Sequence, residues 1–444
     1  MSQFPTRIEA EAGRQLSPDE IFTITATREA KLSRLLILYI ATGLFFMLLP
    51  GTFLGVWNLL TISSQHAPTS VSPAWIQAHG HAQIFGWIGS FILGIGFYSI
   101  PKLRRMNSLA LRVVWVAWAL WTSGVSLRWL VGIYLWHWRV LLPVSAALEL
   151  AAFLLFFRSV SSHRSDSGKS GFEDWVLLVM VGSFGLLATL LINLGLTIHL
   201  ALRAQDPAVP PGFDQEFLVL QTWGVLVLFV WGFSAKWLPI FLGMKPIRGK
   251  VLLAAVGLNT AGVIAAFAAR MRLAAILLVI GILLAIFGLR LFETTERPAK
   301  TKGVHSSFPV FVRLAYAWAV AAACLGIWAA SAPDSQGIWG ASRHALTVGF
   351  LATMVFAVGQ RVLPAFSGMR LLFSTKLMFI ALLLLSFGCL LRVSSEVLAY
   401  QNVVPSAWKW LPVSAIAEMT AVTIFALNLL ATFAQRPPSA AITP

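Results

Sequence analysis

Three histidines lie at the starts of two long hydrophobic segments of the chain. His79 and His81 open a segment over 79–100, and His344 lies at the start of one over 343–366. Ionisable side chains are costly inside a membrane, so each is a candidate for function. Two neutral imidazoles from different helices can bind the iron of one haem from its opposite faces. We therefore expect His81 and His344 to be the axial ligands of a haem.

His79 and His81 cannot bind one small metal ion together from a regular helix. Two positions along a helix correspond to about 200° of rotation, so their side chains point to opposite sides. His79 could bind a second haem, bind copper with ligands from outside the segment, or cap the start of the helix. A simpler interpretation of all three histidines is that they lie at the membrane interface, hydrogen-bonded to loop carbonyls.

Arginines stand near the same predicted membrane face. Arg128 and Arg392 close two other hydrophobic segments, and Arg343 directly precedes His344. A guanidinium group binds a carboxylate through two parallel hydrogen bonds. A haem at this depth would direct its propionates toward this face, so we expect the three arginines to bind them. The alternative is that these side chains extend to the lipid headgroups.

Two glutamates occupy equivalent places inside hydrophobic segments. Glu149 and Glu418 each follow a proline, Pro143 or Pro412, by six residues. A buried carboxyl group usually becomes neutral or finds a partner. A hydrogen bond to a neighbouring helix is the favoured interpretation, and a proton relay is the alternative.

The composition places these residues in a membrane protein. The 444 residues are 58% hydrophobic and 11% charged, whereas a soluble domain has roughly 25% charged residues. The net charge of +16 comes from short loops rather than from a basic stripe with exposed aromatics, which excludes a nucleic-acid-binding protein. Cys324 and Cys389 form no Cys-x-x-Cys motif, so no covalent haem or zinc ribbon is expected.

Twelve hydrophobic segments are long enough to span a bilayer. They lie near 36–60, 79–100, 109–130, 139–157, 175–201, 216–242, 250–269, 272–292, 309–331, 343–366, 373–393 and 407–433. Only eight of the 33 Lys and Arg residues fall on one side of the predicted membrane. The positive-inside rule then predicts that both termini are cytoplasmic and that the histidines lie near the outer face.

Three successive segments recur later in the chain in the same order. The shared residues are His81 and His344, Gly86 and Gly349, Gly96 and Gly359, Pro101 and Pro364, Arg128 and Arg392, and Glu149 and Glu418. A weaker third copy keeps Gly224 and Pro239, with Val219 in place of the histidine. These repeats predict an all-α membrane protein of three pseudo-symmetric four-helix groups.

The chain is therefore expected to hold one membrane domain between two short tails. The predicted parts are a cytoplasmic tail over 1–34, a membrane domain over 35–434 with repeat units near 36–157, 175–292 and 309–433, and a cytoplasmic tail over 435–444. Its immediate partner is the lipid bilayer.

The segment from His79-Gly80-His81-Ala82 through Gly86-Trp87 to Pro101-Lys102-Leu103 resembles the haem-bearing helices of haem–copper oxidase catalytic subunits. The whole chain, including His344-Ala345-Leu346-Thr347-Val348-Gly349, is more similar to the NnrS family of twelve-span bacterial membrane proteins. That resemblance implies the bacterial inner membrane, haem b, copper, and a role in nitric-oxide stress. The sequence assigns no copper ligands.

The oxidase pattern is incomplete in this chain, so enzymatic turnover is left open. The sixth and seventh segments, over 216–242 and 250–269, contain no histidine, and oxidases place metal-binding histidines there. We expect a b-type haem protein that handles nitric oxide or passes single electrons, with one haem, or two if His79 binds another. The alternatives are a secondary transporter and a non-catalytic anchor subunit of a respiratory complex that binds haem or quinol.

Overall fold

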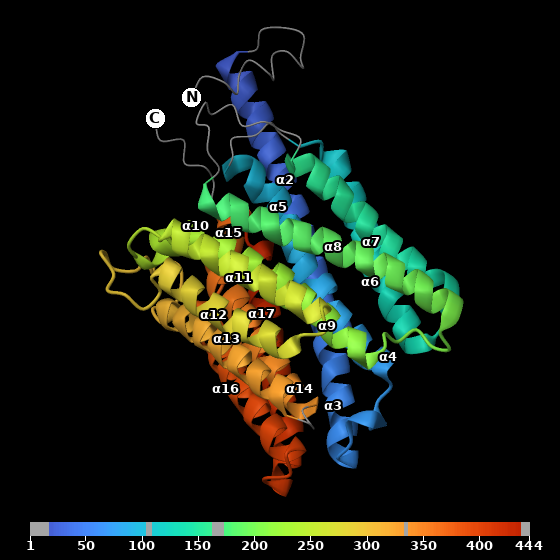
Figure 1. Ribbon diagram of the computed structural model, residues 1–444. Coiled ribbons are helices and arrows are strands. Elements are labelled where there is room, and N and C mark those ends of the chain that lie inside the picture. Colours follow the sequence, from blue (N-terminus) through green and yellow to red (C-terminus); the bar gives the residue numbers. More distant parts are fainter. Residues whose placement is uncertain (1–16, 104–108, 162–172, 333–335, 437–444) are drawn as a thin grey trace.

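The computed structural model describes residues 17–103, 109–161, 173–332 and 336–436, and these residues form helices and loops without a β-strand (Figure 1). Twelve helical stretches are long and apolar enough to cross a membrane, so the chain is an all-α, multi-pass membrane protein. The α-helices are α2 (Pro18–Phe46), α3 (Leu54–Gln65), α4 (Pro73–His81), α5 (Ser90–Leu103), α6 (Leu111–Tyr134), α7 (Trp138–Ser161), α8 (Asp174–Arg203), α9 (Pro211–Gln221), α10 (Val227–Leu242), α11 (Gly249–Phe267), α12 (Met271–Leu289), α13 (Phe308–Ser331), α14 (Gln336–His344), α15 (Thr353–Phe366), α16 (Thr375–Tyr400) and α17 (Trp410–Ala434).

The first helix begins earlier than the sequence analysis expects. Ser17 caps α2, and its hydroxyl accepts a hydrogen bond from the backbone N–H of Glu20, whose carboxylate accepts one from the N–H of Ser17. This reciprocal cap and Pro18 in the first turn start a helix well before the hydrophobic stretch. Residues 18–34 are therefore helical. The rest of the expected tail, 1–16, lies outside the described residues, as do residues 437–444 of the expected C-terminal tail.

The twelve spans form three groups of four that pack in the same way. The most extensive contacts join the third and fourth spans of each group: α6 with α7, α11 with α12, and α16 with α17. The fourth span of each group then packs against the first span of the next: α7 with α8, α12 with α13, and α17 with α3. The last of these contacts closes the ring. This arrangement confirms three pseudo-symmetric four-helix groups.

The second span of each group contains a π-helical segment at an equivalent position. These segments are η3 (Ala82–Gly89) between α4 and α5, η4 (Thr222–Leu226) between α9 and α10, and η5 (Ala345–Ala352) between α14 and α15. The first and last residues of η5 each follow those of η3 by 263 residues, which is also the offset between the repeated residues of these two spans. Another, η1 (Met47–Phe53), joins α2 to α3 and contains Pro50, which lacks a backbone N–H. Such segments are frequent at functional sites.

Side chains from the third span satisfy carbonyls in or beside the π-helical segments. The Trp121 Nε1–H donates to the carbonyl of Phe85 over 3.1 Å, and the Asn259 Nδ2–H donates to the carbonyl of Trp223 over 2.9 Å. The two donors are 138 residues apart in the sequence, and so are the two acceptors, so the contact follows the pseudosymmetry. In the third group the Cys389 thiol lies 3.9 Å from the carbonyl of His344.

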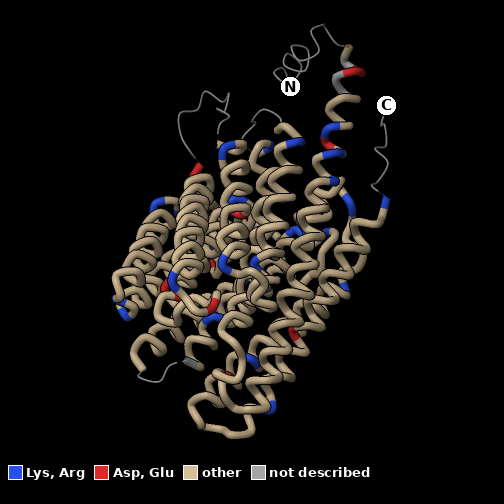
Figure 2. Tube along the Cα trace, turned by 90° about the vertical axis from the view of Figure 1, so that its right-hand side faces the viewer, with Lys and Arg blue, Asp and Glu red and all other residues tan. Residues whose placement is uncertain are grey.

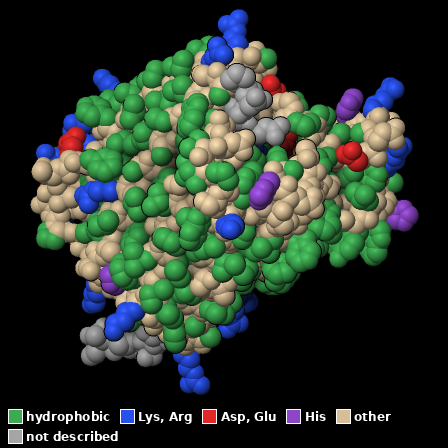
Figure 3. Space-filling view, turned by 90° about the horizontal axis from the view of Figure 1, so that it is seen from below, with side chains coloured by type: hydrophobic (Ala, Val, Ile, Leu, Met, Phe, Trp, Pro, Cys, Tyr) green, Lys and Arg blue, Asp and Glu red, His purple; other side chains and the backbone are tan. Residues whose placement is uncertain are grey.

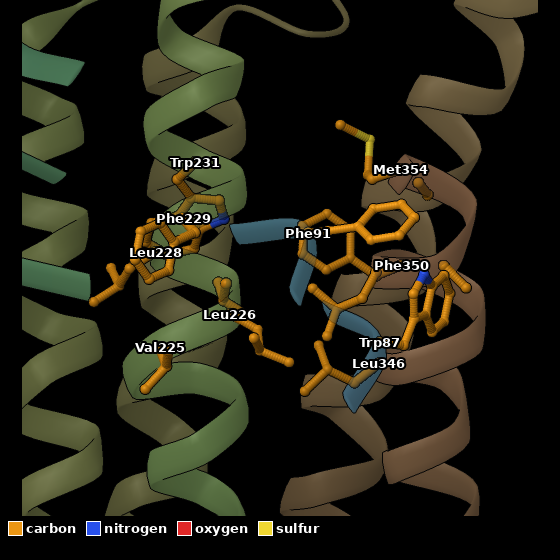
Figure 4. Close-up of a cluster of buried hydrophobic side chains, with 14 of the residues drawn as sticks. Trp87, Phe91, Val225, Leu226, Leu228, Phe229, Trp231, Leu346, Phe350 and Met354 are labelled. Atoms are coloured by element: carbon orange, nitrogen blue, oxygen red, sulfur yellow. The ribbon is translucent and has the colours of Figure 1, made fainter. Parts of the chain in front are cut away.

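The second spans of the three groups, which contain η3, η4 and η5, are the most buried of the twelve, so they lie at the centre of the ring. Apolar side chains from all three meet there, and Figure 4 shows Trp87 and Phe91 facing Leu226, Leu346 and Phe350. We call this cluster, together with Met354, the central plug. Figure 2 shows Lys and Arg gathered toward the end where α2 begins and sparse at the opposite end.

Candidate functional site

One cavity of about 1090 Å³ brings together all six side chains that the sequence analysis selected as haem ligands or propionate ligands: His79, His81, Arg128, Arg343, His344 and Arg392. Its wall includes Thr69 from the α3–α4 connection, Pro211 at the start of α9, and Ala330 near the end of α13. These connections lie at the face away from the start of α2, so the cavity reaches that face. Figure 3 views the molecule from there, with hydrophobic side chains predominating and most basic ones toward the edge.

The histidines lie further inside their helices than expected. α4 begins at Pro73, with six residues before His79, and α14 begins at Gln336, well before His344. His81 and His344 are each the last α-helical residue before a π-helical segment, η3 or η5. All three side chains lie on the cavity wall, inside their membrane spans rather than at the start of them.

His79 is oriented by the backbone of the first span. Its Nδ1 lies 2.8 Å from the carbonyl of Gly51 in η1, so it donates its proton there and leaves the lone pair on Nε2. Its ring also packs against Gly55, where a Cβ atom would come within 2.6 Å of Cε1. A backbone carbonyl on one ring nitrogen is the usual support for a histidine that binds metal through the other.

His344 is oriented in the same way by a carboxylate. Its Nδ1 lies 3.0 Å from Oε2 of Glu396 and 2.9 Å from the carbonyl of Gly340. The Nε2 atom lies 3.2 Å from a terminal nitrogen of Arg392, which can only donate, so Nε2 carries the lone pair. His344 is therefore neutral, and iron binding at Nε2 would require Arg392 to turn away.

His81 has a different environment from its counterpart in the repeat. Its Nε2 lies 2.8 Å from Oε1 of Glu149, and its ring stacks on Phe85 with centroids 4.4 Å apart. The Nε2 atom of His81, which would bind a ligand in the cavity, is thus hydrogen-bonded to the carboxylate of Glu149. The electrostatic neighbours of His79 include His344 and Arg392. Because Nε2 of His79 has no protein partner in these hydrogen bonds and Nε2 of His81 does, His79 is favoured over His81 as the partner of His344.

Arg128 is a buried cation that lacks a direct partner among the described residues. Its side chain is 7% exposed, and its Nε has no hydrogen-bond partner. Glu149 and Asp214 are its electrostatic neighbours, but neither forms an ion pair with it within the described residues. The Nε of Arg392 also lacks a hydrogen bond, although it lies 3.6 Å from Oε2 of Glu396. A buried charge of this kind needs an anion or polar ligand nearby.

The two predicted glutamates keep their repeat geometry but differ in their partners. A Cβ atom on Gly124 would lie 2.8 Å from Cγ of Glu149, and one on Gly388 would lie 2.8 Å from Cγ of Glu418. Oε1 of Glu149 hydrogen-bonds His81, and no such partner contacts Oε1 of Glu418 in the described part of the chain. Oε2 of Glu149 is likewise buried without a hydrogen-bond partner there. The favoured expectation of a helix-to-helix hydrogen bond thus describes Glu149 only.

Two acidic residues of the site were missed by the sequence analysis. Glu396 binds His344, and Asp214 lines the cavity with Arg343 and Arg128 as its electrostatic neighbours. The spacing of Arg392 and Glu396, one helical turn apart inside an apolar span, could have identified the first. Asp214 precedes the hydrophobic segment expected over 216–242, so hydropathy alone placed it outside the membrane.

No group of three His, Cys, Asp or Glu side chains that could hold a metal ion occurs within residues 17–103, 109–161, 173–332 and 336–436. Copper therefore has no three-residue ligand set in the described part of the chain. Haem iron differs, because the porphyrin supplies four of its ligands and the protein needs to supply only one or two.

Part of the chain matches a known protein family. The family described as Domain of unknown function (DUF8744) matches residues 222–433, from η4 to the end of α17. This region contains Arg343, His344, Arg392, Glu396 and Glu418, whereas His79 and His81 lie before it. No curated protein matches the chain.

Proposed function

We propose that the chain is a membrane-embedded haem b protein of NnrS type, with the haem in the central cavity. His79 and His344 would supply the axial nitrogens, and Arg128, Arg343 and Arg392 would bind the propionates. The observation that carries this proposal is that imidazoles from two different groups line one cavity, each with Nδ1 hydrogen-bonded so that Nε2 bears the lone pair.

The size and wall chemistry of the cavity fit such a group. Its volume of about 1090 Å³ is at the upper end of small-molecule and cofactor sites, which are mostly about 300–1,000 Å³. Several buried polar atoms on its wall lack hydrogen-bond partners among the described residues. They are Asn58 Oδ1, Gln83 Oε1, Trp87 Nε1, Arg128 Nε, Asn193 Nδ2, Arg392 Nε and Glu418 Oε1. Native proteins leave few such atoms, so a polar or charged occupant is expected.

When bound, haem b would supply one-electron redox chemistry, and binding of a diatomic gas would require one of the two histidines to leave the iron. The residues of the chain would orient it and exclude water. Gly51 and Glu396 fix the histidine rings, and the central plug closes the inner end of the cavity. We place the protein in a bacterial inner membrane with cytoplasmic termini, so that the cavity faces the outer side. Its role would be in nitric-oxide or nitrogen-oxide stress, or in single-electron transfer.

The test is a reduced-minus-oxidised absorption spectrum of the purified protein. A six-coordinate haem b gives a sharp α-band on reduction with dithionite. We expect His79→Ala and His344→Ala each to lose at least half of this band, because each removes one axial ligand. His199→Ala is the matched control, since His199 is exposed on the outer surface of α8 and should leave the band unchanged.

The variant series also decides between the two candidate partners of His344. If the band is lost in His81→Ala and retained in His79→Ala, then His81 binds the iron together with His344. Protein purified without any haem signal, and unable to take up added haemin, would contradict the proposal as a whole.

A secondary transporter is the second candidate, favoured by the interrupted helices. Transporters place their substrate sites near the membrane midplane, at discontinuous helices. Here η3, η4 and η5 surround the inner end of a cavity whose wall carries acids and histidines. A haem-free protein that takes up a solute into proteoliposomes under a proton gradient would support this function instead.

A further inference from the structure

The carboxyl groups around the cavity outnumber the guanidinium groups. Asp214, Glu396 and Glu418 line the wall, and Glu149 lies behind His81. The arginines on the wall are Arg128, Arg343 and Arg392. Four acids therefore face three permanent cations in an environment where an uncompensated charge is costly.

The charged neighbours of these groups place them in three sets, which overlap because Arg128 is also near Asp214 and Arg343 is also near Glu396. The first is Arg128 with Glu149, whose carboxylate His81 also contacts. The second is Asp214 with Arg343, which comes first among its charged neighbours. Each of these sets is balanced when its acid is ionised.

The third set is not balanced. It contains Arg392, Glu396 and Glu418, together with His344. His344 adds no charge, because its Nε2 accepts from Arg392 and its Nδ1 donates to Glu396. Arg343 is a second charged neighbour of Glu396, but Asp214 already balances its charge. Arg392 is therefore the one remaining cation for two carboxyl groups. The other titratable neighbours on α16 are Cys389, a buried thiol, and Tyr400, and neither side chain supplies a positive charge.

The repeat explains why Glu418 is the carboxyl group that lacks a balancing cation. Its counterpart Glu149 binds His81 through Oε1, although its Oε2 is also buried without a hydrogen-bond partner among the described residues. In the third group His344 is bound by Glu396 instead. Glu396 has no acidic counterpart in the first group, because the equivalent position there is Gly132. Glu418 is left with one buried oxygen that has no hydrogen-bond partner in the described part of the chain, and the side chain borders the cavity.

We propose that Glu418 carries a proton at neutral pH and exchanges it with the cavity, so that Arg392, Glu396 and Glu418 form a proton-binding site. The bound proton makes the set neutral, and the cavity provides the path by which it enters and leaves from the face where the cavity opens. This inference does not rest on haem binding, because it follows from the charges of the chain itself.

Infrared spectroscopy of the full-length protein in lipid at neutral pH tests the site. A protonated carboxyl group has a C=O band that is distinct from the bands of carboxylates and shifts in D2O. We expect the wild type to show such a band and Glu418→Gln to lose it. Glu396→Gln should lose it too, because Glu418 can then ionise beside Arg392. Glu149→Gln is the matched control and should keep it, since that carboxylate belongs to a balanced set.

Absence of an exchangeable carboxyl band in the wild type would overturn the proposal whether or not the variants fold. A band that disappears in Glu149→Gln but survives in Glu418→Gln would also overturn it, by placing the proton on the first set. A band that persists unchanged in Glu396→Gln would show that the negative charge of Glu396 is not what keeps Glu418 protonated. Visible spectra of the same samples report haem separately, so either proposal can fail alone.

Discussion

Glu396 is held between a histidine and a glycine at the edge of the cavity. Its Oε2 accepts from His344, and its Oε1 occupies the space that a Cβ atom on Gly340 would need. The glycine therefore allows α14 and α16 to approach closely enough for the carboxylate to reach the imidazole. In the first group this arrangement is absent, because Gly132 of α6 packs against Ala78 of α4 instead.

Gly340→Ala should displace Glu396 and break its contact with His344. The added Cβ would lie 2.3 Å from Oε1, which is closer than real contacts allow, so we expect a loss of stability of about 1–3 kcal/mol. Gly257→Ala on α11 is the control, because nothing lies within 4 Å of its Cβ position. Thermal unfolding in detergent measures both. Equal stability of the two variants would mean that Glu396 relaxes without cost.

The π-helical segments depend on donors from neighbouring helices. Asn259 of α11 makes such a bond to η4, whereas Asn193 of α8 lines the cavity with an Nδ2 that has no partner among the described residues. The two buried amides thus differ in what their removal would cost. Hydrogen bonds between membrane helices contribute about 0.6–2 kcal/mol each.

Asn259→Leu should destabilise the protein by about 1 kcal/mol, because the carbonyl of Trp223 loses its donor. Asn193→Leu should be neutral or slightly stabilising, since it removes a donor that is already unpaired. The difference between their unfolding midpoints in one detergent is the measurement. A larger loss for Asn193→Leu would show that its amide has a partner in solution, such as a ligand or water.

Much of the fold at this scale was predictable from the sequence. Hydropathy located twelve spans, and the recurrence of histidine, glycine, proline, arginine and glutamate identified the equivalent helices of the first and third groups. The π-helical segments were not predictable, because they depend on donors such as Trp121 that arrive from other helices. The same limit applies to the site. Symmetry suggested His81 as the partner of His344, but Glu149 from α7 engages its Nε2 and Gly51 orients His79.

At the scale of the whole molecule, the ring of spans encloses a cavity with one open end. The wall reaches loops and helix ends at the face away from the start of α2 and ends near Trp87 and Leu226. Beyond that level, Phe91, Phe350 and the rest of the central plug fill the axis (Figure 4). A ligand should therefore enter and leave by one face.

Single cysteines along α14–α15 would test this one-sided access. In a chain lacking Cys324 and Cys389, Thr347→Cys on the cavity wall should react with a membrane-impermeant thiol reagent added to the outside of cells. Gln360→Cys, buried further along the same span, should react at least tenfold more slowly. Reaction of Thr347→Cys only from the cytoplasmic side would contradict the proposed orientation. Equal reaction of both would show that the plug is no barrier.

The central plug also determines where an electric field across the membrane would be felt. Water and ions that enter the open cavity carry the outside potential inward, so most of the voltage falls across the packed apolar layer beyond the cavity, which includes Phe91, Phe350 and Met354. A proton that binds at Glu418 from the open side crosses little of this field. Its uptake and release should consequently be electrically silent, and a membrane potential should neither drive nor oppose them.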